Sequence, residues 1–155
     1  MARTKDADGD RRGALEYLRD HHVLTLAVTD AKGPWAAAVF YAADGFRCLF
    51  LSDPRSRHAR AIEGDRRTAA TVNDQPEDWR AIRGLQLEGT CRRLSGAAHA
   101  GALARYLARF ASASADPRLA GPLARADMYE FTPRRAFLID NRRFGERVEI
   151  SVADR

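Results

Sequence analysis

The sequence predicts a single, mostly β, α+β domain in which six or seven antiparallel strands close into a small barrel with flanking helices. Short runs rich in β-branched and aromatic residues follow one another, separated by turn signals. Helical periodicity is confined to a few segments, which argues against a doubly wound sheet. The length of 155 residues, with no internal repeat or linker, is that of one ordinary domain.

The N-terminal half predicts a helix followed by a three-stranded meander. Residues 1–10 are charged and are expected to form a flexible tail, so the domain is placed at 11–155. Within 11–20, Leu15 and Leu18 share one face of a short amphipathic helix. Asp44-Gly45 is a strong hairpin signal between the second and third strands. The predicted strands are Val23–Thr29, Trp35–Ala42 and Phe46–Leu51.

The remaining chain predicts a second helix, a third helix and the strands that close the barrel. Asp53 is the expected N-cap of the second helix, Pro54 its first residue, and Gly64 its end. A longer amphipathic helix is expected over 97–111. Closing these strands into a barrel removes exposed sheet edges. The further predicted strands are Thr68–Asn73, Leu85–Leu94, Met128–Thr132, Ala136–Ile139 and Arg147–Val152.

Composition indicates a cytoplasmic globular protein that does not enter the membrane. Hydrophobic residues make up 45%, and the longest apolar run, Trp35–Ala43, is only as long as a strand. No apolar N-terminal segment resembles a signal peptide. Cys48 and Cys91 are therefore expected to be reduced thiols, and no spacing typical of a metal site is present.

The basic charge favours a nucleic-acid partner only weakly. The net charge is +5, but the arginines are scattered along the chain and often stand beside Asp or Glu. A nucleic-acid-binding barrel also needs aromatic residues interleaved with basic ones on one sheet face, which the predicted strands lack. This function is therefore the least favoured of those considered.

The segment 49–59 carries the most informative chemistry. A strand ends in Ser52, and a helix follows with Ser56, Arg57 and His58 in its first turn. Free backbone N–H groups, the helix dipole, hydroxyls and a guanidinium would then converge, as binding of a phosphate monoester requires. A purely structural alternative weighs about equally: Asp53 caps the helix and pairs with Arg57, and His58 covers the surface.

Several short motifs between His22 and Gly145 resemble those of a known family. The sequence is similar to the pyridoxamine-phosphate-oxidase-like FMN-binding split barrels, and particularly to the bacterial YhbP-like branch. The resemblance implies a split barrel, an FMN cofactor and a homodimer whose flavin sites are built from both chains. The motifs are His22–Thr25, Trp35–Tyr41, Ser56–Ala59, Thr71–Pro76, the most specific block Ile82–Leu94, Asp140-Asn141 and Phe144-Gly145.

The resemblance also assigns candidate cofactor-binding residues. It implies that Ser52, with Ser56-Arg57-His58, grips the FMN phosphate, with His58 standing where the oxidases have Lys. It places the backbone around Ala37 and Val39 beside the isoalloxazine ring.

The sequence departs from the oxidases at three positions that the resemblance places near the flavin. Their strand Arg and Lys fall on Ala37 and Ala42, and their flavin-contacting Gln falls on Gly84. Gln86 lies two residues further on the same strand face, and Arg83 is a candidate positive charge near the flavin.

The leading hypothesis is an FMN-dependent oxidoreductase with an unidentified small-molecule substrate, in which the cofactor carries the electron chemistry. The alternative is a non-catalytic split barrel that carries or senses a flavin or haem, favoured by the replacements at Ala37, Ala42 and Gly84. A deazaflavin is a further option for the cofactor. No residue in the sequence is singled out as a nucleophile or general base.

Overall fold

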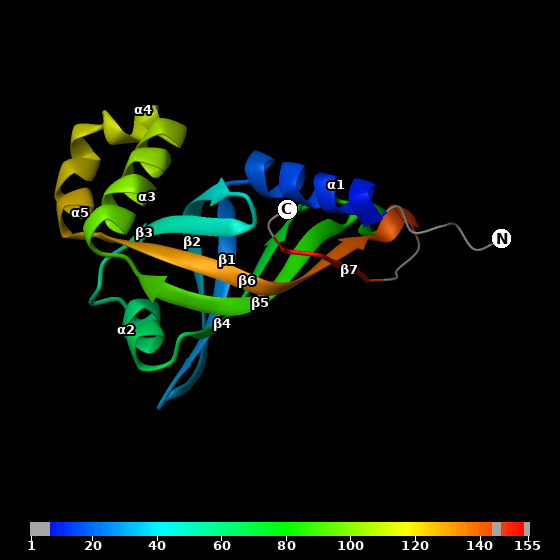
Figure 1. Ribbon diagram of the computed structural model, residues 1–155, viewed down its shortest axis with the longest axis horizontal. Coiled ribbons are helices and arrows are strands. Elements are labelled where there is room, and N and C mark those ends of the chain that lie inside the picture. Colours follow the sequence, from blue (N-terminus) through cyan, green and yellow to red (C-terminus); the bar gives the residue numbers. More distant parts are fainter. Residues whose placement is uncertain (1–6, 144–146, 154–155) are drawn as a thin grey trace.

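Strands β1 to β6 form a closed antiparallel barrel, and β7 extends the sheet by pairing with the part of β6 that β3 does not reach (Figure 1). The computed structural model describes residues 7–143 and 147–153. The strand order is β3-β2-β1-β4-β5-β6-β7, and a pairing between β3 and β6 closes the ring. The predicted small barrel is thereby confirmed. The strands are β1 (Val23–Asp30), β2 (Gly33–Asp44), β3 (Arg47–Ser52), β4 (Arg67–Asn73), β5 (Arg83–Arg93), β6 (Asp127–Asp140) and β7 (Val148–Ile150).

The helices lie at three places around this barrel (Figure 1). α1 runs across one end, α2 lies near the other, and α3, α4 and α5 form a group beside β2 and β3. Within the described residues, no helix has the length and apolar character needed to cross a bilayer. The α-helices are α1 (Ala7–Asp20), α2 (Arg57–Gly64), α3 (Gly96–Arg109), α4 (Ala111–Ser114) and α5 (Ala120–Arg125).

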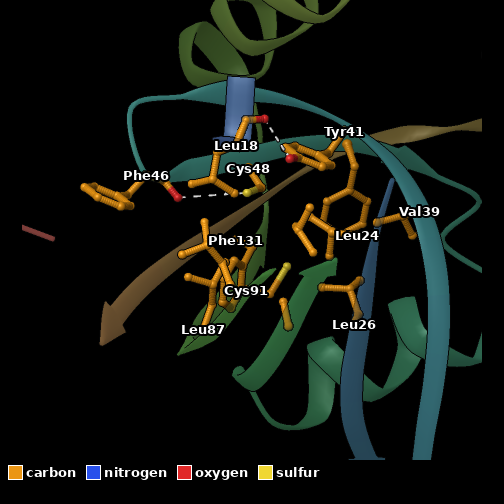
Figure 2. Close-up of a cluster of buried hydrophobic side chains, with 14 of the residues drawn as sticks. Leu18, Leu24, Leu26, Val39, Tyr41, Phe46, Cys48, Leu87, Cys91 and Phe131 are labelled. Atoms are coloured by element: carbon orange, nitrogen blue, oxygen red, sulfur yellow. Dashed lines mark hydrogen bonds between the residues drawn. The ribbon is translucent and has the colours of Figure 1, made fainter. Parts of the chain in front are cut away.

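Alternation along each strand separates the barrel interior from its outer face. The interior is filled by side chains such as Leu24, Leu26 and Phe131, all fully buried (Figure 2). Leu18 of α1 closes one end of this core, and its carbonyl accepts a 2.7 Å hydrogen bond from the buried Tyr41 hydroxyl (Figure 2). Burial of this apolar surface is the main stabilising contribution to the barrel.

A second apolar cluster lies outside the barrel, beneath α3. Leu49 of β3 points outward into it, whereas Cys48 and Phe50 point inward, as the alternation predicted. Tyr106 and Phe110 of α3 cover this outer cluster. The helical group is therefore packed on the barrel by its own small core.

No helix in the described chain covers the outer face formed by β1, β2 and β4. Ala27 of β1 pairs with Ala36 of β2 on one side and with Ala69 of β4 on the other, and all three are exposed. At the end of this face Val23 and Phe40 are cross-strand partners, 52% and 43% exposed. The result is an accessible surface with small and apolar side chains at its centre.

The structure forms helices in two stretches where the sequence predicted none. α1 begins at Ala7, because Asp10 is buried there and pairs with Arg143, so residues 7–10 of the expected tail are helical. α5 forms where an irregular Pro- and Gly-containing stretch was expected, with Pro122 tolerated in its first turn. Residues 1–6 and Phe144-Gly145 lie outside the described residues.

The largest difference is that β6 is one continuous strand instead of two. Pro133 interrupts the sequence pattern, but the register with β5 shifts between Glu88 and Gly89. Gly89 pairs with Pro133 and Glu88 with Arg135, which leaves Arg134 as the extra residue of a bulge. A bulge accommodates a proline that cannot donate to the ladder, so the strand continues through it.

Candidate functional site

The first turn of α2 is capped by Ser56 and not by Asp53 as the sequence indicated. The Ser56 side chain accepts a 3.3 Å hydrogen bond from the backbone N–H of Ala59. Asp53 instead accepts from the backbone and guanidinium of Arg55 at 2.8–3.1 Å, and this lowers its pKa to about 2. A local Asx-type turn satisfies this carboxylate before the helix begins. The expected pairing of Asp53 with Arg57 is likewise absent among the described contacts.

Ser52, Ser56 and His58 form one hydrogen-bonded cluster at this helix start. His58 Nε2 lies 2.6 Å from Ser52 Oγ and 3.3 Å from Ser56 Oγ, and the two hydroxyl oxygens are 3.3 Å apart. Burial lowers the pKa of His58, so the neutral imidazole is favoured near neutral pH. The cluster therefore offers two hydroxyl donors and a titratable ring on one spot.

Arg57 lies beside this cluster but points toward the β1–β2 hairpin. Its Nε and Nη2 donate to the two carboxylate oxygens of Asp30 at 2.8 and 3.0 Å. Its guanidinium also lies 4.5 Å from the centre of the Trp35 ring. This pairing lowers the pKa of Asp30 to about 2, chiefly through the Arg57 hydrogen bonds. The cation next to the cluster is thus compensated by a carboxylate.

This arrangement fits a phosphate monoester in part. The hydroxyls of Ser52 and Ser56 and the free N–H groups of the first turn of α2 are suitable donors, and the helix dipole favours an anion there. The positive charge of Arg57 would become available to the anion only if the guanidinium exchanged Asp30 for it.

The other predicted cofactor residues fall into separate regions. Gln86 lies on the outer face of β5, in register with Thr71, beside two hollows of about 340 and 350 Å³. Val39 is buried in the core, so only its backbone is available to a ligand, and Ala37 is half-buried on the same strand. Arg83 lies under α1, with its guanidinium 5.0 Å from the Tyr17 ring. The structure therefore separates Arg83 from Gln86.

The structure gives a physical reason for two of the departures from the oxidase pattern, at Gly84 and Ala42. A Cβ on Gly84 would lie 2.8 Å from the Val72 carbonyl oxygen, so a glutamine there requires a backbone shift. Ala42 is 4% exposed and packs in the cluster beneath α3, where a charged side chain would lose its hydration. The glutamine that falls on Gly84 and the cation that falls on Ala42 therefore have no equivalent in this chain.

An apolar cavity of about 390 Å³ lies between the helical group and the β2–β3 edge. Phe40, Tyr106 and Phe110 form an aromatic wall, with ring centres 4.3 Å apart for Phe40 and Phe110. Ser52 of the hydroxyl cluster also lines it, and Arg125 of α5 lies at its polar side. His22 packs edge-on against Phe40 and Phe110, both at 5.8 Å.

Sequence reasoning missed Asp30, Arg125 and the cavity. Asp30 is 27 positions from Arg57, and nothing local to either residue signals the pairing. The cavity depends on α5, a helix that the sequence pattern did not reveal. No group of three or more metal-ligating side chains gathers within residues 7–143 and 147–153.

Comparison with known proteins identifies the family. Residues 13–140 match the family described as pyridoxamine 5'-phosphate oxidase. The chain belongs to this family. Its relatives within the family include a UPF0306 protein of Klebsiella pneumoniae, 35% identical over 130 residues that cover 81% of each chain. The UPF0306 protein YhbP of Salmonella arizonae is 38% identical over 96 residues, which cover 61% of this chain and 65% of that protein.

Solved structures share the fold of this family member. A haem-binding protein from Mycobacterium smegmatis superposes with a TM-score of 0.74 at 21% identity, covering 98% of this chain and 60% of that one. An FAD-binding protein from Mesorhizobium loti gives 0.64 at 13% identity, covering 78% and 85%. At these identities the likeness concerns the split-barrel fold alone.

Proposed function

We propose that this protein binds FMN, with the phosphate held at the Ser52–Ser56–His58 cluster. The observation that carries the proposal is the convergence of two hydroxyls and an imidazole within 3.3 Å at the N-terminus of α2. A phosphate monoester accepts hydrogen bonds from such hydroxyls and from free helix N–H groups, and the helix dipole adds to its attraction. The fold of the family and an FAD-binding neighbour support a flavin ligand.

Arg57 is the cation of the proposed site. Its guanidinium is held by Asp30 and by the Trp35 ring. Arg57 stands between Ser56 and His58 in the sequence, so it is next to the cluster. Binding of a dianionic phosphate replaces the single carboxylate as its partner, because guanidinium groups bind phosphate oxygens in the same bidentate geometry. Asp30 therefore acts as a competitor that lowers the affinity for FMN.

The outer face beside β2 is the proposed place for the ring system. Ala36 and Ala38 are exposed there, so a planar ligand can approach the backbone closely. Gln86 of β5 contributes an amide on the same outer face. A second copy of the chain, docked on this face, covers the ring and completes the site.

Bound FMN supplies electron and hydride transfer, so the proposed activity is an oxidoreductase acting on a small molecule. The protein residues bind and orient the cofactor: hydroxyls hold the phosphate, Arg57 neutralises its charge, and the β2 backbone supports the ring. His58 belongs to the phosphate anchor in this scheme and is assigned no role in proton transfer.

The proposal is tested by titrating the purified protein with FMN and with riboflavin, which lacks the phosphate. FMN is expected to bind more tightly, and the preference is expected to vanish in Ser56→Asp. Aspartate caps a helix as well as serine does, so this change adds a charge at the anchor while keeping the helix start. Ser95→Asp, at the start of α3, is the matched control. Equal affinity for FMN and riboflavin would refute the phosphate anchor.

A second candidate ligand, haem, is favoured by one observation. His22 packs against Phe40 and Phe110, which line the apolar cavity, and an imidazole is a common axial ligand of haem iron. Its ring nitrogens lie 3.2 and 3.5 Å from Arg109 Nη2, a contact that haem ligation would replace. A haem-binding protein shares the fold. A haem absorption band that shifts in His22→Ala, with no difference between FMN and riboflavin, would favour this candidate over the first.

A further inference from the structure

The cavity between α3, α5 and the β2–β3 edge is a second candidate binding site, and its lining defines the ligand. Its volume of about 390 Å³ lies within the usual range for small-molecule pockets, roughly 300–1,000 Å³. The walls are mostly apolar and combine aromatic residues with aliphatic residues of the helical group. The main wall residues are Phe40, Tyr106, Leu107, Phe110, Leu119 and Leu123.

Three polar residues line this cavity, namely Ser52, Asp53 and Arg125. Ser52 and Asp53 are adjacent in the chain, and the charge of Arg125 acts on Asp53, so these groups can fix the polar end of a ligand with an apolar body. Such a small number of polar groups in an otherwise apolar pocket orients a ligand and sets its specificity.

The charge available to a ligand at this side is positive. Asp53 is already compensated, since its carboxylate accepts three hydrogen bonds from Arg55. Arg125 forms no salt bridge with any carboxylate in the described part of the chain. Its positive charge acts on Asp53 from beyond ion-pair distance. The net charge of Asp53, Arg55 and Arg125 is therefore +1, which selects an anion and not an amine.

We infer that this cavity binds a small apolar carboxylic acid, with a flat or short hydrocarbon body against the aromatic wall and its carboxylate on Arg125. The inference goes beyond the proposed flavin site, because it uses the cavity walls and Arg125, and shares only Ser52 with the phosphate anchor. It also differs from the haem candidate, because the ligand is held by Arg125 and not by His22, which is not among the residues that line the cavity. A guanidinium binds a carboxylate through two parallel hydrogen bonds, and the surrounding apolar walls strengthen that contact.

The test is calorimetric titration of the full chain with 2-naphthoate and with 2-naphthol, its uncharged analogue. We expect 2-naphthoate to bind with one site per chain, and 2-naphthol to bind at least about tenfold more weakly, the value of one charge-assisted hydrogen bond. In Arg125→Gln that preference is expected to disappear. Arg118→Gln, in the turn that precedes α5, is the matched control, because Arg118 pairs with Asp116 and does not line the cavity, and it should behave as the unaltered protein.

A second variant tests the cavity itself. Leu123→Trp fills it from α5 and should abolish binding of both compounds, whereas thermal unfolding shows whether the variant is folded. If that variant does not fold, the charge test with Arg125→Gln decides alone. The inference is overturned if 2-naphthoate fails to bind, if the two compounds bind equally well, or if Arg125→Gln leaves the preference intact. Displacement of 2-naphthoate by one equivalent of FMN would also overturn it, because the cavity would then belong to the flavin.

Discussion

Arg57 is the side chain whose partner decides how strongly the proposed anchor attracts an anion. Its hydrogen bonds to Asp30 are bidentate, and both side chains remain partly accessible to solvent. A phosphate dianion offers the guanidinium the same bidentate geometry with more negative charge, and the pair is accessible to solvent, so the exchange of Asp30 for a ligand phosphate is energetically accessible.

Replacement of Asp30 by Asn should therefore tighten FMN binding, while Arg57→Gln should weaken it. The first change removes the competing carboxylate and frees the guanidinium, and the second removes the guanidinium itself. Each effect is expected to be roughly tenfold, the value of one charge-assisted contact. Fluorescence titration of FMN measures both. Asp65→Asn, which disturbs a comparable pair with Arg67 outside the site, is the control. Weaker binding by Asp30→Asn would show that Asp30 supports the site.

His58 should make folding stability depend on pH below its ordinary pKa of 6.5. Burial lowers its pKa in the folded protein, so between the two values the folded state binds fewer protons than the unfolded state. The stability from this group is present above pH 6.5 and is lost as the pH falls. Urea unfolding between about pH 7.5 and 5 should show this decline, and His58→Gln should flatten it. Asp30 and Asp53, each with a pKa of about 2, stay ionised throughout this range. An equally steep decline in the variant would assign the effect to other groups.

At the scale of single residues, the sequence could predict contacts only between residues that are close together in the chain. Ser52, Ser56 and His58 are separated by six positions at most, and the change from strand to helix brings them together. Asp30, by contrast, reaches Arg57 only through the packing of α2 against the hairpin. The sequence also could not decide which residue caps α2, because both Asp53 and Ser56 are good capping residues.

Among the elements, β6 was the hardest to predict and the most informative. Proline normally marks the end of a strand, and no local pattern around Pro133 indicates the bulge that lets β6 continue. The bulge becomes visible only with its partner, since Gly89 on β5 makes room for the Pro133 backbone. The strands predicted at Val23–Thr29 and Leu85–Leu94 were confirmed to within two residues at each end, as β1 and β5.

Gly89→Ala should disrupt the pairing of β5 with β6 at the bulge. A Cβ at this position would lie 2.1 Å from the Thr132 carbonyl oxygen and 2.7 Å from the Pro133 Cα, so the backbone must move. We expect a loss of at least about 2 kcal/mol in the free energy of unfolding, measured with urea. Gly101→Ala is the matched control: it lies in α3 with nothing within 4 Å of the new Cβ, and should stabilise the protein by about 0.5–1 kcal/mol. Unchanged stability of Gly89→Ala would mean that the bulge adapts freely.

At the level of the whole molecule, the barrel was predictable because most of its strands have a recognisable sequence pattern. The helical group was not predictable as a whole, because α5 lacks such a pattern. α5 contains Gly121 and Pro122, and its stability comes from the neighbours that it packs on and not from helix propensity. The apolar cavity and the accessible β1–β2–β4 face exist only once these parts are assembled.

The exposed face of β1, β2 and β4 predicts a homodimer in solution. Its centre is Ala27, opposite Ala36 and Ala69, and its end carries Val23 and Phe40, both about half exposed. Sedimentation equilibrium should therefore give twice the chain mass of 17.2 kDa. Ala27→Arg places a charge in the middle of this face and should yield a folded monomer, because burying an unpaired charge against a second copy is costly.

The same variant connects assembly to the proposed flavin site. If the second chain completes the site, Ala27→Arg should lose FMN affinity together with the dimer, although Ser52, Ser56 and Arg57 are untouched. Ala104→Arg, on the exposed side of α3, adds the same charge elsewhere and should leave both properties unchanged. A monomer that still prefers FMN to riboflavin would show that one chain suffices to hold the phosphate. A dimer that persists in Ala27→Arg would place the contact between copies on another surface.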